Sequence, residues 1–116
     1  METVFRLEQE LGFHPRDVSA EKVGYDIESL NPADGRLRFI EVKGRKADAS
    51  TVTVTRNEVL TALNKPEDFI LAIVRVNGSQ IEPAYVRRPF TNDVDFSVES
   101  LNFKMRDLLS QATKPS

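Results

Sequence analysis

Cysteine is absent from this chain of 116 residues, and histidine occurs once, as His14. Without cysteine there is no disulfide framework, no thiolate zinc site and no cysteine nucleophile. A single histidine likewise excludes a histidine-rich metal site. A metal bound by this chain would therefore be a hard cation with oxygen ligands, such as Mg²⁺ or Mn²⁺.

Long apolar segments are missing too. No run approaches the roughly 20 residues of a membrane-spanning helix, and no signal peptide opens the chain, so we expect a cytoplasmic protein without a membrane partner. With 40% hydrophobic and 29% charged residues, the composition is that of an ordinary globular protein. We expect a single domain over residues 1–110 and a frayed tail over residues 111–116.

Charge is unevenly distributed along the chain. The net charge of −2 argues against a strong general affinity for nucleic acid. Residues 1–34 carry eight acids and three bases, whereas residues 35–60 carry six bases and three acids. The basic segment surrounds Glu41, so it is either the path of a phosphate backbone or a solvated basic loop.

Hydrophobic periodicity predicts the order of helices and strands. A helix over residues 3–11 ends at Gly12. Strands are predicted over residues 24–30, 36–43, 51–55, 69–76 and 80–87, a second helix at the capping box of residues 55–58, and a last helix within residues 101–109. The polar stretch over residues 13–22 is predicted to be irregular. This order predicts an α/β fold with a mixed sheet flanked by helices.

Glu41 and Lys43 lie two residues apart in the strand over residues 36–43. Since side chains of a strand alternate, both project from the same face, roughly 6.5 Å apart. A carboxylate beside an ammonium group is typical of a metal-dependent phosphodiester site, where the acid holds the metal and the lysine stabilises an attacking water. The alternative is a salt bridge on a solvated face.

The turn over residues 31–35 sets a register for the hairpin. A four-residue loop places Ile27 opposite Ile40, and the same register places Asp26 opposite Glu41. Two facing carboxylates repel each other unless a cation lies between them. A slip of one residue would turn Asp26 to the other face of the sheet.

Glu8 falls within the apolar sector of the first helix, about 40° from Val4 at 100° per residue. A glutamate turned toward the core is costly unless it is protonated, paired or bound to a metal. Glu8 therefore either joins the other acids, or it reaches water at the edge of the sector or pairs with an arginine.

The segments at residues 24–29 (GYDIES), 38–44 (RFIEVKG) and 53–58 (TVTRNE), together with the helix acid, resemble the PD-(D/E)XK nuclease superfamily. More specifically, the chain is similar to an uncharacterised domain family related to the C-terminal region of the protein NO VEIN. The likeness covers roughly residues 2–90, and Tyr25 replaces the proline of the motif. The resemblance implies a restriction-endonuclease-like αβββαβ core. It also implies an association with helicase-like ATPases of the Swi/Snf type and with restriction-linked proteins.

The resemblance also implies roles for individual residues. Asp26 and Glu41 would ligate Mg²⁺ or Mn²⁺, helped by the carbonyl of Val42. Lys43 would position or deprotonate the attacking water, and Glu8 would hold a metal-bound water. The predicted catalytic set is thus Glu8, Asp26, Glu41 and Lys43.

Other polar residues have simpler interpretations. Glu58 closes the capping box of the second helix, and His14 is expected on the surface. Asn57 either faces the site or is an exposed residue of the first helical turn. Arg87 and Arg88 either contact a phosphate backbone or blunt an edge of the sheet.

Three hypotheses for function follow. The first is an Mg²⁺-dependent nuclease-like domain that acts on DNA together with a helicase-like ATPase. The second is an inactive nuclease fold that binds nucleic acid or a protein partner. The third is a small assembly domain with no site of its own. The cluster of Glu8, Asp26, Glu41 and Lys43 favours the first, because a module that only binds has no use for it.

Overall fold

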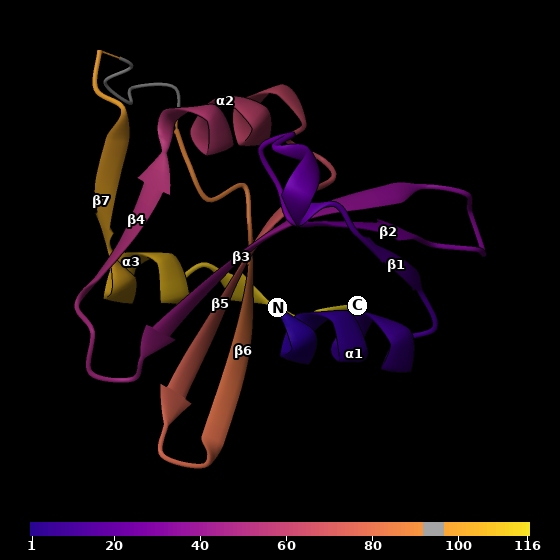
Figure 1. Ribbon diagram of the computed structural model, residues 1–116, viewed down its shortest axis with the longest axis horizontal. Helices are drawn as coiled ribbons and strands as arrows, with labels where there is room; N and C mark the ends of the chain where they lie inside the picture. The colour runs from indigo at the N-terminus through magenta and orange to yellow at the C-terminus, as the bar shows by residue number, and fades with distance from the viewer. Residues whose placement is uncertain (92–96) are drawn as a thin grey trace.

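The computed structural model describes residues 1–91 and 97–116. Its elements are α1 (Glu2–Glu10), β1 (His14–Asp17), the 3-10 turn η1 (Ser19–Glu21), β2 (Ile27–Leu30), β3 (Leu37–Lys46), β4 (Thr51–Thr55), α2 (Arg56–Asn64), β5 (Phe69–Asn77), β6 (Gln80–Arg87), β7 (Ser100–Lys104), α3 (Met105–Leu109) and β8 (Ala112–Thr113). Six strands form one sheet in the order β1-β2-β3-β5-β6-β8. Strands β3 and β5 are parallel and the other neighbours are antiparallel. The fold is therefore α/β with a mixed sheet, as predicted (Figure 1).

The β2–β3 hairpin has the predicted register. Ile27 lies opposite Ile40, and Leu30 lies opposite Leu37. Gly35 closes the turn with a φ of 75°, which a residue without a side chain adopts at little cost. A loop of fixed length and two matched apolar pairs thus determine which residues face each other.

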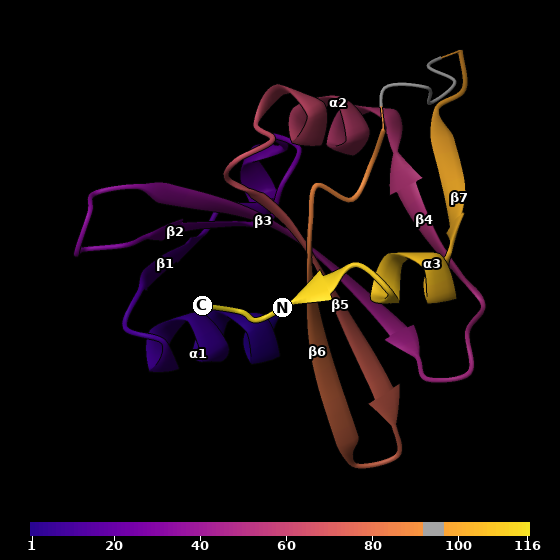
Figure 2. The same ribbon diagram turned by 180° about the vertical axis from the view of Figure 1, so that it is seen from behind.

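The two faces of the sheet are covered by different elements (Figures 1 and 2). We call them the α1 face and the α2 face. The α1 face buries a cluster of Val4, Ile27, Ile40, Ile70, Ala72, Val74 and Tyr85. The α2 face lies under α2, α3 and the β4–β7 pair and buries Val52, Val54, Val59, Ala62, Phe69, Leu71, Ile73, Val86, Phe90, Met105 and Leu108. Strand β5 contributes to both clusters, which confirms that it is covered on both sides.

Strand β4 forms where it was predicted but lies outside the six-stranded sheet. It pairs with β7 as a separate two-stranded sheet. Val52 and Val54 are fully buried on the α2 face, whereas Thr53 and Thr55 are exposed. The alternation therefore makes β4 a cover over the central sheet, not one of its members.

Three segments differ from the prediction. The stretch predicted to be irregular contains β1 and η1. The predicted C-terminal helix is divided, since residues 100–104 form β7 and only Met105–Leu109 are helical. The tail over residues 111–116 is not frayed: β8 pairs with β6, and Arg87 donates to the Thr113 hydroxyl (3.0 Å). These errors share a cause, because short strands that pair only at an edge have little periodicity.

The helices are short, and α1 and α2 each have nine residues. In the part of the chain that the structure describes, no helix has both the length and the apolar character needed to cross a membrane.

Candidate carboxylate–lysine site

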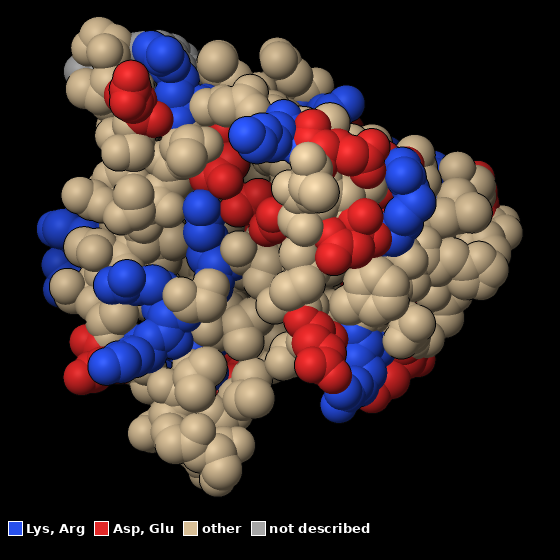
Figure 3. Space-filling model, viewed as in Figure 1, with Lys and Arg blue, Asp and Glu red and all other residues tan. Residues whose placement is uncertain are grey.

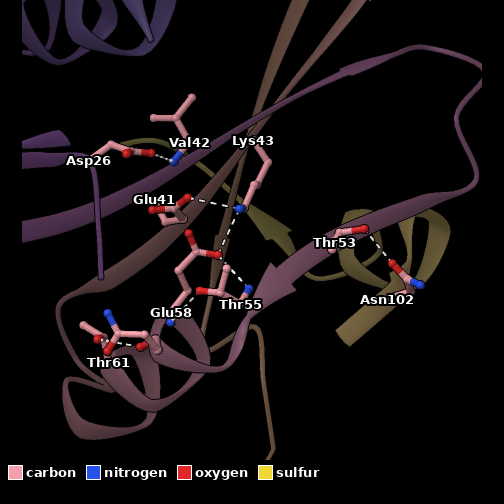
Figure 4. Close-up of polar contacts among 10 residues, drawn as sticks. Asp26, Glu41, Val42, Lys43, Thr53, Thr55, Glu58, Thr61 and Asn102 are labelled. Atoms are coloured by element: carbon pink, nitrogen blue, oxygen red, sulfur yellow. Dashed lines mark hydrogen bonds and ion pairs between the residues drawn. The ribbon is translucent and has the colours of Figure 1, made fainter. Parts of the chain in front are cut away.

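Four ionisable residues meet on the α2 face, just before β2 begins (Figure 4). Asp26 precedes β2, Glu41 and Lys43 lie on β3, and Glu58 lies in the first turn of α2. A cavity of about 240 Å³ lies here, lined by Ser19, Lys22, Gly24, Tyr25, Asp26, Glu41, Thr55, Asn57 and Glu58. The structure thus brings together three of the four residues predicted to be catalytic and adds Glu58.

Glu41 and Lys43 lie side by side, as the alternation of the strand predicts. The Lys43 Nζ lies 3.3 Å from Glu41 Oε2 and 2.9 Å from Glu58 Oε1. The Glu41 side chain is 6% exposed and the Lys43 side chain 20% exposed. The pair is therefore not a salt bridge on a solvated face, because most of it is removed from water.

Glu58 has two structural roles. Its carboxylate accepts a hydrogen bond from the backbone N–H of Thr55 (2.9 Å), and its own N–H donates to the Thr55 hydroxyl (3.2 Å). This is the predicted capping box. The same Oε1 atom also accepts from Lys43 Nζ (2.9 Å). The capping motif predicts that Glu58 lies in the first turn of α2. Nothing in the sequence indicates that the Glu58 carboxylate faces Lys43.

Asp26 binds the backbone of β3 where the pairing with β2 stops. Its N–H donates to the Ile40 carbonyl (2.8 Å), and its Oδ2 accepts from the Val42 N–H (2.9 Å). Glu41 and Asp26 line the same cavity. The register therefore brings Asp26 to Glu41 as predicted, although its carboxylate turns to the backbone.

Gly24 positions the segment that carries Asp26. Its φ is 91°, and a Cβ at this position would lie 2.2 Å from Thr61 Oγ1 of α2. Only a residue without a side chain allows this contact. The predicted strand over residues 24–30 begins only at Ile27.

Burial and the neighbouring carboxyl groups determine the protonation of Glu41. Burial raises the pKa of Glu41 to about 9, and the hydrogen bond to Glu58 and the charges of Glu58 and Asp26 act in the same direction. Burial alone would raise the pKa of Glu58, but its hydrogen bonds with Glu41, Thr55 and Lys43 lower it below its usual value. Burial opposes the charge of Lys43, yet the contacts with Glu58 and Glu41 outweigh it and raise the Lys43 pKa. At neutral pH Glu41 is therefore protonated while Glu58 and Lys43 are charged.

Glu8 does not join the other acids, and this expectation was wrong. It is fully buried on the α1 face, where its Oε2 accepts from the Tyr85 hydroxyl (2.7 Å). Its Oε1 lies 3.5 Å from Nε of Arg38, whose guanidinium stacks on Phe13. Arg38 is on the opposite face from Glu41, because the two are three residues apart in one strand. The alternative of pairing with an arginine is correct.

The remaining polar residues lie as follows. His14 is exposed in β1, as expected. Asn57 is exposed and also lines the cavity, so both of its interpretations hold. Arg87 binds the C-terminal segment, and Arg88 forms an ion pair with Glu67.

Oxygen donors for a cation are present but are not gathered around one point. Within residues 1–91 and 97–116, no three acidic or histidine side chains are arranged to hold a metal ion. Asp26 uses one oxygen on the Val42 N–H, and Glu41 holds a proton. The donors of the predicted set (the Asp26 and Glu41 carboxylates and the Val42 carbonyl) are nevertheless of the type that Mg²⁺ and Mn²⁺ prefer. These residues therefore suit such a cation by the chemistry of their donor atoms. Glu41 would have to lose its proton to bind it.

Comparison with known proteins links the chain to a family. The model of the family described as Protein NO VEIN, C-terminal, matches residues 1–86. The match includes α1, the hairpin with Asp26, the Glu41–Lys43 strand and α2. No curated protein matches the chain.

Proposed function

Since the chain belongs to the family of the protein NO VEIN C-terminal region, and since Asp26, Glu41 and Lys43 share one place on its sheet, we propose a nuclease-like function. The domain would be of the PD-(D/E)XK type and would hydrolyse phosphodiester bonds of DNA with a divalent metal. The observation that carries this proposal is the buried Glu41 beside a charged Lys43, at a cavity that Asp26 also lines.

The element order supports a restriction-endonuclease-like core as part of the proposal. Helix α1, strands β2, β3 and β4, helix α2 and strand β5 follow one another as αβββαβ. The chain differs from this core in two ways. It has an additional strand, β1, and its strand β4 lies outside the six-stranded sheet.

Asp26, Glu41 and the Val42 carbonyl would hold Mg²⁺ or Mn²⁺, which when bound supplies Lewis acidity and activates water. Glu41 must first release its proton, since a protonated carboxyl group is a poor ligand. Lys43 would orient the attacking water and stabilise negative charge on the phosphate. Glu58 would act as a positioning residue, because it holds Lys43 charged and in place.

One set of observations favours a second function, an inactive nuclease fold that binds nucleic acid or a protein. The helix acid Glu8 lies on the other face, and Glu41 is protonated. No three acidic side chains of the described residues gather around a metal position. On this hypothesis Lys43 and Glu58 are a structural ion pair between β3 and α2.

Metal binding and DNA nicking test the first function together. We expect Mn²⁺ to bind the full chain in titration calorimetry, and Mg²⁺ or Mn²⁺ to support nicking of supercoiled plasmid. Glu41→Gln should abolish both, whereas Lys43→Ala should keep metal binding and lower nicking by about 100-fold or more. Glu2→Gln is the matched control, because Glu2 is an exposed acid of α1 paired only with Arg6 among the described residues.

The outcomes separate the two functions. Nicking that persists in both site variants would refute the assigned roles. A chain that binds no Mn²⁺ would support the inactive fold.

Targeting of the proposed nuclease to DNA would come from a helicase-like ATPase, as a fused or separate partner. Nicking is therefore measured with and without such a partner.

A further inference from the structure

One edge of β3 is open beyond the site. The Phe39 N–H donates to Asp68 and the Ala47 N–H to Val76, so the odd-numbered residues of β3 bond toward β5. The even-numbered residues then bond toward the β2 side, as the Val42 N–H does with Asp26. Since β2 runs beside β3 only from Leu37 to Ile40, the backbone groups of the following even-numbered residues face an edge that β2 does not cover.

The side chains along this end of β3 are basic. Lys43 and Arg45 project from the same face, about 6.5 Å apart, and Arg45 lies directly beside Arg75 of β5. Arg75 is paired with Glu82 (3.0 Å). Among the described residues, neither Arg45 nor Lys46 has an acidic partner. Lys43 and Arg75 are each compensated by a glutamate, so the positive charge left at this end of β3 is that of Arg45 and Lys46, which favours an anion.

The surface at this edge is hollow and adjoins the site. Gly44, Arg45, Lys46, Asp48 and Ala49 line a surface depression of about 430 Å³. No atom lies within 4 Å of the position that a Cβ of Gly44 would occupy. Figure 3 shows acidic side chains near the centre of this view, with basic side chains continuing toward the lower left. A ligand can therefore reach the backbone at Gly44 while it contacts Arg45.

We infer that this open edge, with Arg45 and the Gly44 N–H, binds a phosphate group of a nucleic-acid backbone next to the one held at the carboxylate–lysine site. The inference rests on the proposed function, because only a backbone crossing that site brings a second phosphate here. A bidentate guanidinium and a strand-edge N–H are both suited to phosphate oxygens. An acidic peptide is the other anionic occupant to be tested, and the competition experiment below distinguishes it from DNA.

Binding is measured without divalent metal, so that it does not depend on catalysis. The full chain is titrated into a fluorescein-labelled DNA duplex in EDTA, and anisotropy is followed between about 50 and 200 mM salt. We expect Arg45→Ala to weaken binding several-fold and to reduce the slope of log K against log salt by about 0.9 for the lost phosphate contact. Arg45→Lys should recover most of the slope, because it restores the charge. The matched control is Arg6→Ala, which removes an exposed arginine from α1.

Each outcome decides one proposal. Arg45 and Arg6 variants with equal affinities and slopes would overturn the phosphate contact. Displacement of the DNA by poly-glutamate at equal charge concentration would overturn it too, in favour of an acidic peptide. If binding depends on Arg45 but the wild-type chain never nicks DNA, the contact stands and the catalytic proposal fails. If the wild type nicks DNA but binding is independent of Arg45, only the contact fails.

Discussion

The proton on Glu41 should make the stability of the folded chain depend strongly on pH. The folded-state pKa is about 9 and the ordinary value is 4.5. Between these values the native state holds a proton that the unfolded state has released, so stability falls as pH rises. One such proton changes the free energy of unfolding by about 1.4 kcal/mol per pH unit. From about pH 6 to about pH 8 this group alone should remove about 3 kcal/mol.

Glu41→Gln isolates this effect. Glutamine is neutral at every pH and keeps a hydrogen-bond donor and acceptor in place of the protonated carboxyl group. The free energy of unfolding of the variant should therefore be nearly independent of pH in the same window. The measurement is urea unfolding followed by far-ultraviolet circular dichroism at several pH values. Few other side chains titrate in this window, because the chain has no cysteine and His14 is its one histidine.

Two results would refute this reasoning. Parallel pH profiles for the wild type and Glu41→Gln would mean that Glu41 is charged in the native state. A wild-type profile that rises with pH would mean that its pKa is lowered, not raised. Added Mg²⁺ or Mn²⁺ provides a second check, because a cation that replaces the proton should recover stability toward the alkaline end of the window.

Three other substitutions test the architecture. Tyr85→Phe should cost about 1–3 kcal/mol in urea unfolding, since it leaves the buried Oε2 of Glu8 without its donor (2.7 Å); an unchanged midpoint would contradict that role. Thr55→Ala should cost about 1 kcal/mol by removing the cap of α2, and thermal unfolding should show it. Gly24→Ala should destabilise the fold, because its Cβ would meet Thr61 Oγ1 at 2.2 Å and its φ is positive. Thr61→Ala in that background removes the Oγ1 contact but leaves the Thr61 Cβ at 3.0 Å and the positive φ, so it should recover only part of the lost stability.

Local rules were enough for the hairpin and for α2. The turn length and the apolar pair Ile27–Ile40 determine a register that brings Asp26 to Glu41, and the structure has this register. The capping box likewise places the start of α2 at Thr55. In the hairpin a tight turn fixes the pairing, and in the capping box the two partners are three residues apart, so the local pattern decides which residues meet.

The rest of the site depends on which face each element covers. Helical periodicity correctly indicates that Glu8 is buried, but it does not say that α1 covers the side of β3 opposite to Glu41. The contact between Lys43 and Glu58 joins residues 15 apart, across a crossover that returns to the same side. Neither relation is contained in a hydrophobic pattern. For the same reason the pattern predicts the strand β4 but not its place outside the central sheet, because its partner β7 lies about 50 residues further along the chain.

The segment after β6 determines how the chain can be shortened. The family match ends at residue 86, yet β7 supplies the strand that pairs with β4, and Met105 and Leu108 fill the cluster beneath it. Arg38, which neutralises Glu8 beneath α1, also donates to the carbonyl of Pro115. A fragment cut at the family boundary would uncover the side of β4 and loosen the guanidinium beneath α1. We therefore expect the shortest fragment that folds independently to be longer than the region that the family model matches.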